Sequence, residues 1–350
     1  MSLSQLRVGL GRVVSARQSP FTLLAVLVAA LVSAPIVALM AIAATPAAID
    51  SLAHLADTVL PRYALTSALL ALQVGFWVIA IGVPSGWMIA AYEFPGKRVL
   101  SIGLILPLAM PAFVLAYAYT DLLDVSGPLQ SWLRARFDLR VGEYWFPQVR
   151  SLPGAGLFLG LALYPYVYVL ARNAFAERSE SLSEAARSLG LPAPLVWLRV
   201  VWPVARPAVV AGATLAMMET LADFGTVSFF AVDTFSFGIY RAWQSFGDRA
   251  AAAWLALALL ATVLMLIWLE RRQRGRMAFH ARALRPAPPQ RLRGAAALLV
   301  FVLCTIPVLA GFVLPSLVLL NSASSSPRAF DPRLLGWVWN TALLSAAAVA

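Results

Sequence analysis

Cysteine and lysine are almost absent from this sequence of 350 residues, which contains one of each. The single cysteine, Cys304, excludes a disulfide framework within the chain, a redox pair and a cysteine zinc site. The chain also lacks the glycine-rich P-loop signature that ends in Gly-Lys-Ser or Gly-Lys-Thr, so a P-loop site for ATP is excluded.

Charged residues are scarce as well. They make up 12% of the chain, whereas soluble domains average about 25%, and 61% of the residues are hydrophobic. Several apolar runs reach the ~20 residues that a helix needs to span a bilayer. These features predict an all-α fold, a polytopic transmembrane helix bundle. Spans are expected near residues 21–44, 64–92, 100–123, 153–171, 207–232, 250–269 and 295–320, and an eighth is expected to begin near 337.

The basic residues predict the orientation of the chain. The apolar run 21–44 is too long for the core of a signal peptide, about 7–15 residues, so we interpret it as a retained first span. With the N-terminus in the cytoplasm, 18 of the 27 basic residues fall in cytoplasmic segments, in agreement with the positive-inside rule. The two histidines, His54 and His280, then lie on opposite sides of the membrane and cannot form a metal cluster. Topology also explains the net charge of +11 more simply than nucleic-acid binding does.

The second half of the sequence indicates a repeat. Segment 271–294 is rich in arginine and proline and is predicted to be a cytoplasmic linker. Thr66–Ala71 opens the second span, and the similar Asn340–Ser345 opens the eighth. The chain stops within that span, so we expect the last part to be truncated. The predicted parts are an N-terminal segment with the first transmembrane helix (1–60), a first core with a cytoplasmic loop at 177–206 (61–270), the linker (271–294) and the start of a second, homologous half (295–350).

The loop 177–206 is the most informative polar segment. It contains Glu184, Ala185 and Ala186, then Gly190, and then Pro203 after a short apolar run. A polar helix and turn at a membrane surface suits docking into a groove on a soluble partner. Glu184 would then provide a charged contact, and the two alanines would allow close approach. The alternative is an ordinary amphipathic helix at the membrane interface.

Local signals predict the structure of this loop. A short helix is expected between about 178 and 191, with Ser183 capping a helix that restarts at Glu184. Gly190 fits a helix end that needs a positive φ angle. Pro192 and Pro194 then prevent the helix from continuing.

The pattern of Glu184, the two alanines, Gly190 and Pro203 resembles the cytoplasmic coupling loop of permease subunits in binding-protein-dependent ABC importers. Over roughly residues 60–260 the chain resembles the ferric-iron permease family, whose members have two fused halves. One departure is Trp202, where the family's loop usually has leucine. The further segments that carry the resemblance are Glu93–Arg98, Leu106–Ala112, Leu163–Arg172, Arg206–Ala208, Met218–Val227 and Thr234–Trp243.

This resemblance implies a type I ABC importer permease fold in the bacterial inner membrane. It implies a dimer of ATP-binding subunits on the cytoplasmic side and a periplasmic substrate-binding protein outside, with lipids as neighbours and no nucleic acid. ATP would bind the partner subunit, so the chain itself would be neither an enzyme nor the holder of a cofactor. The implied cargo is ferric iron, and thiamine and polyamine remain alternatives because their permeases share the fold and the loop.

Four residues are candidates for the translocation path. Glu219 and Asp223 lie four apart in an apolar segment, so they are expected to share one face of a helix. Acidic groups within a bilayer usually face a cavity or a partner, and they would suit a cationic cargo. The alternative is a structural pair held by backbone amides, hydroxyls or an arginine. Tyr164 and Tyr168 also share a helix face and either line the path or pack in the protein.

Two further readings of the sequence stay open. An ion-gradient-driven secondary transporter, with Glu219 and Asp223 as proton carriers, is the alternative from another functional class. The external loop 124–150 combines aromatic residues with four arginines. It is expected either to receive the binding protein or to lie on the outer membrane surface.

Overall fold

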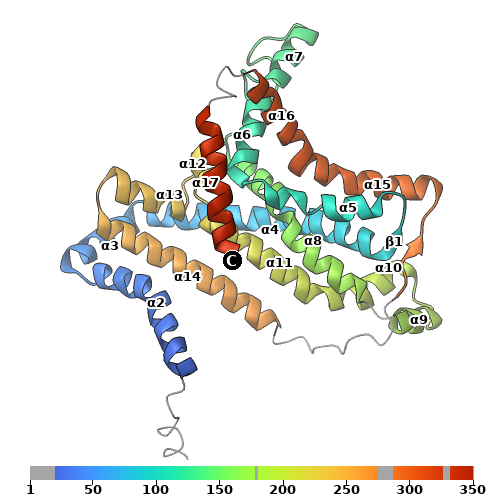
Figure 1. The fold of residues 1–350 in the computed structure, drawn as a ribbon, viewed down its shortest axis with the longest axis horizontal. Helices are drawn as coiled ribbons and strands as arrows, with labels where there is room; N and C mark the ends of the chain where they lie inside the picture. The colour runs from blue at the N-terminus through green and yellow to red at the C-terminus, as the bar shows by residue number, and fades with distance from the viewer. Residues whose placement is uncertain (1–19, 178–179, 275–286, 326–331, 350) are drawn as a thin grey trace, which may run out of the picture. The chain divides into compact units, whose positions relative to one another are not determined.

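The computed structural model of the chain describes residues 20–177, 180–274, 287–325 and 332–349. Arg7, Arg12, Arg17, His280 and much of the 271–294 linker lie outside these residues, so what was expected of them stays a prediction. Six described helices are long and apolar enough to cross a membrane, and a bent pair of helices would make a seventh. The predicted all-α membrane bundle is therefore confirmed (Figure 1).

The chain divides into two compact units, and the smaller one comprises residues up to Pro61 with Gly238–Ala261. Its helix α2 (Pro20–Ala43) is followed by α3 (Pro46–Asp57), which begins after Thr45 because Thr45 has an extended backbone and Pro46 suits a first helical position. The indole of Trp254 donates a hydrogen bond to the Ala48 carbonyl at 2.8 Å. This bond ties the first part of α14 (Arg249–Arg274) to α3. The π-turn η3 (Arg241–Ser245) precedes α14.

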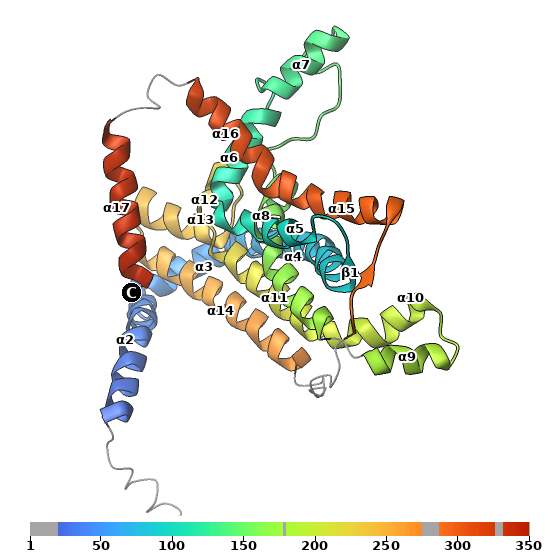
Figure 2. The same ribbon diagram turned by 45° about the vertical axis from the view of Figure 1, so that its right-hand side comes forward.

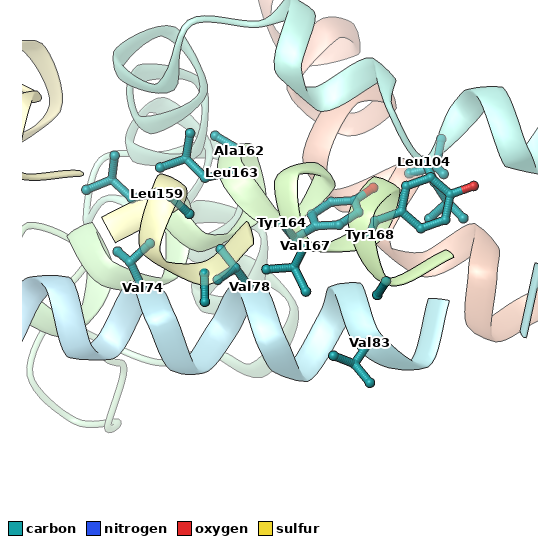
Figure 3. Close-up of a cluster of buried hydrophobic side chains, with 14 of the residues drawn as sticks. Val74, Val78, Val83, Leu104, Leu159, Ala162, Leu163, Tyr164, Val167 and Tyr168 are labelled. Atoms are coloured by element: carbon teal, nitrogen blue, oxygen red, sulfur yellow. The ribbon is translucent and has the colours of Figure 1, made fainter. Parts of the chain in front are cut away.

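The larger unit is built around α8 (Leu152–Ala176), which packs along α11 (Trp202–Ala222) and against α4 (Leu60–Ala91). Glycines allow this close packing. A Cβ atom on Gly82 of α4 would lie 2.8 Å from the Cβ of Val167, and one on Gly212 of α11 would lie 2.9 Å from the Tyr166 carbonyl oxygen. Small residues commonly let helices approach in this way in membranes. Figure 3 shows the buried side chains between α4 and α8, among them Val74, Val78 and Leu159.

The span predicted at 100–123 is wrong as a single helix. The segment consists of α5 (Lys97–Gly103), the 3-10 turn η1 (Leu106–Ala109) and α6 (Ala112–Leu123), and the chain bends by 93° between η1 and α6. Pro107 and Pro111 explain the break, because each lacks an N–H and restricts the residue before it. After α6 the chain continues into α7 (Pro128–Phe137).

The span predicted at 207–232 is also wrong as a single helix. α11 ends at Ala222, Asp223 has an extended backbone (φ −65°, ψ 126°), and a short helix α12 (Gly225–Phe229) follows. The side chain of Asp223 bonds to the start of α12, and such local bonds compete with helix continuation. The next helix, α13, spans Phe235–Tyr240.

The last residues of the predicted linker and those that follow it pack onto the same unit. Strand β2 (Gln290–Arg291) pairs in parallel with β1 (Tyr92–Glu93), and two helical pieces follow: α15 (Gly294–Val308), continued by the π-turn η4 (Leu309–Val313), and α16 (Leu314–Ser324). The Tyr119 hydroxyl donates to the Ala310 carbonyl at 2.6 Å. Figure 2 shows α15 beside α5 and α16 beside α6. The predicted second half thus starts with a helix packed on the first core, and its homology with the first half stays a prediction. The last described helix is α17 (Pro332–Val349).

Candidate coupling loop

The loop 177–206 leaves the end of α8 and returns into α11 (Figure 2). Its first helix, α9, spans Glu180–Ser188, so the expected restart at Glu184 with Ser183 as its cap is wrong: the helix is continuous through both residues. The prediction for Gly190 is confirmed, since its φ angle is +81°. The Gly190 N–H donates to the Arg187 carbonyl at 2.8 Å, and the Leu191 N–H donates to the Ala186 carbonyl at 3.2 Å. These two bonds form a Schellman motif, which closes the helix.

One side of α9 is open to solvent. Glu184 and Ala185 are exposed, whereas Ala186 is buried. Leu189 is 84% exposed, and nothing lies within 4 Å of the position that a Cβ atom on Gly190 would take. The end of α9 therefore presents a charged residue and a large apolar residue on an unobstructed surface.

The returning arm of the loop is set by prolines, as predicted. Pro192 precedes α10 (Ala193–Val196), and Pro194 lies in its first turn. A π-turn, η2 (Trp197–Val201), continues directly into α11, so that Ala193–Ala222 form one helical span, and Pro203, which lacks an N–H, lies just after this π-turn.

A groove of about 830 Å³ separates the loop from the end of α4 and from residues 287–290. Glu184 and Arg187 of α9 line it, together with the aromatic side chains of Trp87, Tyr92 and Trp197. The sequence alone does not indicate these aromatic residues, because their proximity depends on tertiary contacts between segments far apart in the chain.

Glu219 and Asp223 do not share a helix face, because α11 ends before Asp223. The Asp223 carboxylate instead accepts hydrogen bonds from the N–H groups of Thr226 (2.9 Å) and Val227 (3.2 Å), and from the Thr226 hydroxyl (3.2 Å). Its backbone carbonyl accepts from the Ser236 hydroxyl at 2.7 Å. Asp223 is thus held by backbone amides and hydroxyls, whereas Glu219 is exposed on α11.

Tyr164 and Tyr168 lie on one face of α8, as expected, and both are 0% exposed (Figure 3). The Tyr168 hydroxyl donates to the Ser101 carbonyl at 3.0 Å. The Tyr164 hydroxyl is buried without a hydrogen-bond partner in the part of the chain that the structure describes. Both rings therefore belong to the packed interior of the larger unit.

The loop 124–150 forms a small structure of its own at the other end of α8. The buried Gln130 of α7 donates to the Leu123 carbonyl at 2.8 Å and accepts from the Tyr144 hydroxyl at 2.7 Å, and Arg134 donates to Tyr144 at 3.1 Å. A pocket of about 330 Å³ lies beside this network. Trp132 and Trp145 are exposed.

The described residues contain no group of three or more histidine, cysteine, aspartate or glutamate side chains placed to hold a metal ion. The two best-defined parts of the candidate site are the end of α9 and the turn at Asp223.

Comparison with known proteins gives a family match. The family described as "Binding-protein-dependent transport system inner membrane component" matches residues 82–274. The sulfate transport system permease protein CysT of Escherichia coli (strain K12) is 30% identical over 191 residues, which are 53% of this chain and 66% of the relative. The molybdenum transport system permease protein ModB of Haemophilus influenzae is 26% identical over 211 residues, 57% of this chain and 89% of the relative.

A third relative is the Fe(3+)-transport system permease protein FbpB 2 of Haemophilus influenzae, 24% identical over 212 residues, which are 61% of this chain and 37% of the relative. The fold is shared with a crystal structure of a bacterial alginate ABC transporter in complex with an alginate pentasaccharide-bound periplasmic protein. The TM-score is 0.57 at 14% identity, and the match covers 74% of this chain and 94% of that chain. The chain spans 66% of the length of the sulfate permeases that it matches in Escherichia coli and Salmonella typhimurium.

The family match includes the whole returning arm of the loop, α9, Glu219 and Asp223. It covers more than half of the chain, and the fold agrees with it independently. This chain belongs to the family of binding-protein-dependent transport system inner membrane components.

Proposed function

We propose that this chain is the membrane-embedded permease of an ATP-driven importer and that α9 docks it to a separate ATPase subunit. The geometry of α9 carries the proposal. It is a short polar helix, closed by a glycine at positive φ, that presents Glu184 and Leu189 to solvent beyond the end of α8. An exposed leucine next to charged residues is suited to a protein contact, and the family of the chain supports a partner of this kind.

The proposal places the end of α8 that leads to α9 in the cytoplasm and the end that follows α7 in the periplasm. The 25 residues of α8 make a helix about 37 Å long, which exceeds the hydrocarbon thickness of about 30 Å. The excess of basic residues on the α9 side supports the same orientation.

In the proposed mechanism this chain catalyses no reaction, and ATP is hydrolysed on the partner subunits. A loaded binding protein delivers the cargo on the α7 side, and ATP hydrolysis on the partner subunits moves the coupling loop. That movement switches the access of the path between the two sides of the membrane. Glu219 is the acidic group left available for the path, because Asp223 is engaged at the start of α12.

We propose ferric iron as the cargo. One relative is an Fe(3+) permease, and the matched 212 residues are only 37% of its length, so it is far longer than the matched core. This chain likewise continues beyond the matched core into α15 and α16. An acidic residue on α11, Glu219, suits a cationic cargo.

A tetrahedral oxyanion is the second candidate cargo. It is favoured by relatives that are sulfate and molybdenum permeases and that have higher sequence identity to this chain. The carboxylate of Asp223 agrees with this candidate, because its oxygens already accept hydrogen bonds at the start of α12 and are not free to serve as ligands of a cation.

Transport assays test both parts of the proposal. The full transporter, with its ATPase and binding protein, is reconstituted in proteoliposomes, and uptake of radiolabelled ferric iron, sulfate, thiamine and spermidine is measured in parallel. We expect uptake that needs ATP and is unaffected by an ionophore. Uptake without ATP that the ionophore abolishes would show a secondary transporter. Sulfate uptake without ferric-iron uptake would replace the first cargo by the second.

A further inference from the structure

Aromatic rings connect the coupling loop to the membrane-spanning helices. Trp87, near the end of α4, lies at the centre of this connection. Its ring centroid is 5.2 Å from that of Phe175 at the end of α8 and 6.1 Å from that of Trp197 in η2, and both pairs are edge-on. Trp197 in turn stacks on Trp202, the first residue of α11, at 5.8 Å. We call Phe175, Trp87, Trp197 and Trp202 the aromatic ladder.

The ladder joins segments that the backbone does not join. The loop is covalently continuous with α8 and α11, whereas α4 lies far away in the sequence. Trp87 therefore provides a direct side-chain contact between the loop and α4. Tyr92 of β1 extends this contact, with its ring centroid 6.4 Å from that of Trp87.

Ring contacts, and not hydrogen bonds, hold Trp197 in the ladder. Its indole nitrogen is buried and has no hydrogen-bond partner in the part of the chain that the structure describes. All three ladder contacts fall within the range of about 4.5–7 Å that aromatic pairs prefer. Trp87 packs edge to face against Trp197, so a displacement of η2 would have to break this contact or move Trp87 with it.

We propose that Trp87 and Trp197 transmit movement of the coupling loop to α4 and α8, with Trp87 as the positioning residue at which the two helices and the loop meet. This inference rests on the proposed docking of α9 to an ATPase. It adds the path that the movement takes, which neither the family match nor the loop motif specifies.

The test measures the ratio of stimulated to basal ATP hydrolysis in the full transporter, reconstituted with its ATPase and with its binding protein loaded with ferric iron or with sulfate. Trp87→Ala is expected to lower this ratio at least about fivefold while the ATPase still co-purifies. Trp87→Phe keeps a ring at the centre of the ladder and is expected to restore most of the ratio. Trp197→Phe keeps a six-membered ring in the ladder but loses the five-membered ring with its unpaired N–H, so it is expected to retain most of the ratio.

Trp77→Ala is the matched control. Trp77 lies on the same helix, packs against Gly160 of α8 and has its own aromatic neighbour, Phe76, at 5.2 Å, and among the described residues no ring contact joins it to the loop. It is expected to lower thermal stability without lowering the ratio. Equal ratios in Trp87→Ala and Trp77→Ala would overturn the inference. It would also be overturned if the effects of Trp87→Ala and Trp197→Ala on the ratio of stimulated to basal hydrolysis were additive in a double-mutant cycle.

The proposed function fails in a different way. If the wild-type complex shows no stimulated hydrolysis, or no ATPase co-purifies, then α9 is not a docking element and the inference falls with it. If the wild type is stimulated and a variant at Gly190 loses stimulation while Trp87→Ala keeps it, the docking stands and the ladder is only packing.

Discussion

At the scale of single residues, Asp223 is an acidic residue in an apolar segment whose carboxylate has a structural role. Its two carboxylate oxygens accept three hydrogen bonds from Thr226 and Val227. These bonds satisfy N–H groups at the start of α12 that have no partner within the helix. The residue therefore fixes the turn between α11 and α12. A cation that bound to Asp223 would have to compete with these hydrogen bonds for the carboxylate oxygens.

Variants of Asp223 should separate capping from charge. Asp223→Asn keeps one oxygen that can accept the two bonds from the N–H groups of Thr226 and Val227 and loses only the acceptor for the Thr226 hydroxyl, so near-normal stability is expected. Asp223→Ala removes the cap and should lower stability by about 0.5–2 kcal/mol. Thermal unfolding and membrane abundance of the two proteins are the measurements. A loss of uptake per assembled complex in Asp223→Asn, with normal stability, would show instead that the charge acts in transport.

The effect of neutralising Glu219 on uptake is expected to depend on the charge of the cargo. Its side chain is exposed on α11. A carboxylate in a water-filled path raises the local concentration of cations and lowers that of anions. Glu219→Gln is therefore expected to reduce ferric-iron uptake about tenfold at low salt, with unchanged abundance. Sulfate uptake is expected to stay unchanged or to rise, and an equal fall for both ions would remove Glu219 from the path.

At the scale of elements, the end of α9 depends on one backbone conformation. Gly190 has a φ angle of +81°, and a Cβ atom there would meet no atom within 4 Å. A substitution at this position consequently acts through the backbone and through any docked partner, and not through a clash within the chain. Asparagine tolerates this conformation, whereas a β-branched residue does not.

Variants of Gly190 test this element. Gly190→Val is expected to open the Schellman motif, at a cost of roughly 1–2 kcal/mol, and to reduce both co-purification of the ATPase and stimulated hydrolysis. Gly190→Asn is the control and should retain most of both. If Val and Asn gave the same values as glycine, the end of α9 would have no part in docking.

The sequence predicted most elements of the fold, because hydrophobic length is a property of the chain itself. The spans predicted at 64–92 and 153–171 correspond to α4 and α8. Gly190 and Pro192 correctly predicted where α9 ends. The two breaks were missed. Pro107 and Pro111 interrupt a helix within a segment that remains apolar, and the turn at Asp223 depends on bonds to residues beyond the helix end.

The candidate site could be predicted only where its structure depends on residues that are neighbours in the sequence. The conformation of Gly190 follows from short-range signals. The contact of Trp87 with Trp197 and the pairing of β1 with β2 join segments far apart in the sequence, and no single segment contains their signal. The burial of Tyr164 and Tyr168 likewise depends on which helices surround α8, and periodicity alone left it open.

At the scale of the whole molecule, the proposed direction of transport depends on the two loops at the ends of α8. The loop with α7 precedes Leu152, and the loop with α9 follows Ala176. Because one membrane-spanning helix separates them, the two loops must lie on opposite sides of the bilayer. The positive-inside rule supports the proposed cytoplasmic location of the α9 side and of the end of α14, where Arg271 and Arg272 are exposed.

Cysteine labelling tests this arrangement directly. Cys304 is fully buried, so Cys304→Ala gives a background without a reactive thiol and with a small change in packing. Ser131 on α7 and Gln273 at the end of α14 are both exposed. In intact spheroplasts, an impermeant thiol reagent is expected to label the Ser131→Cys variant and not the Gln273→Cys variant. After permeabilisation both should react, which controls for accessibility. Labelling of Gln273→Cys alone in intact cells would invert the molecule and place α9 outside, where no ATPase could reach it.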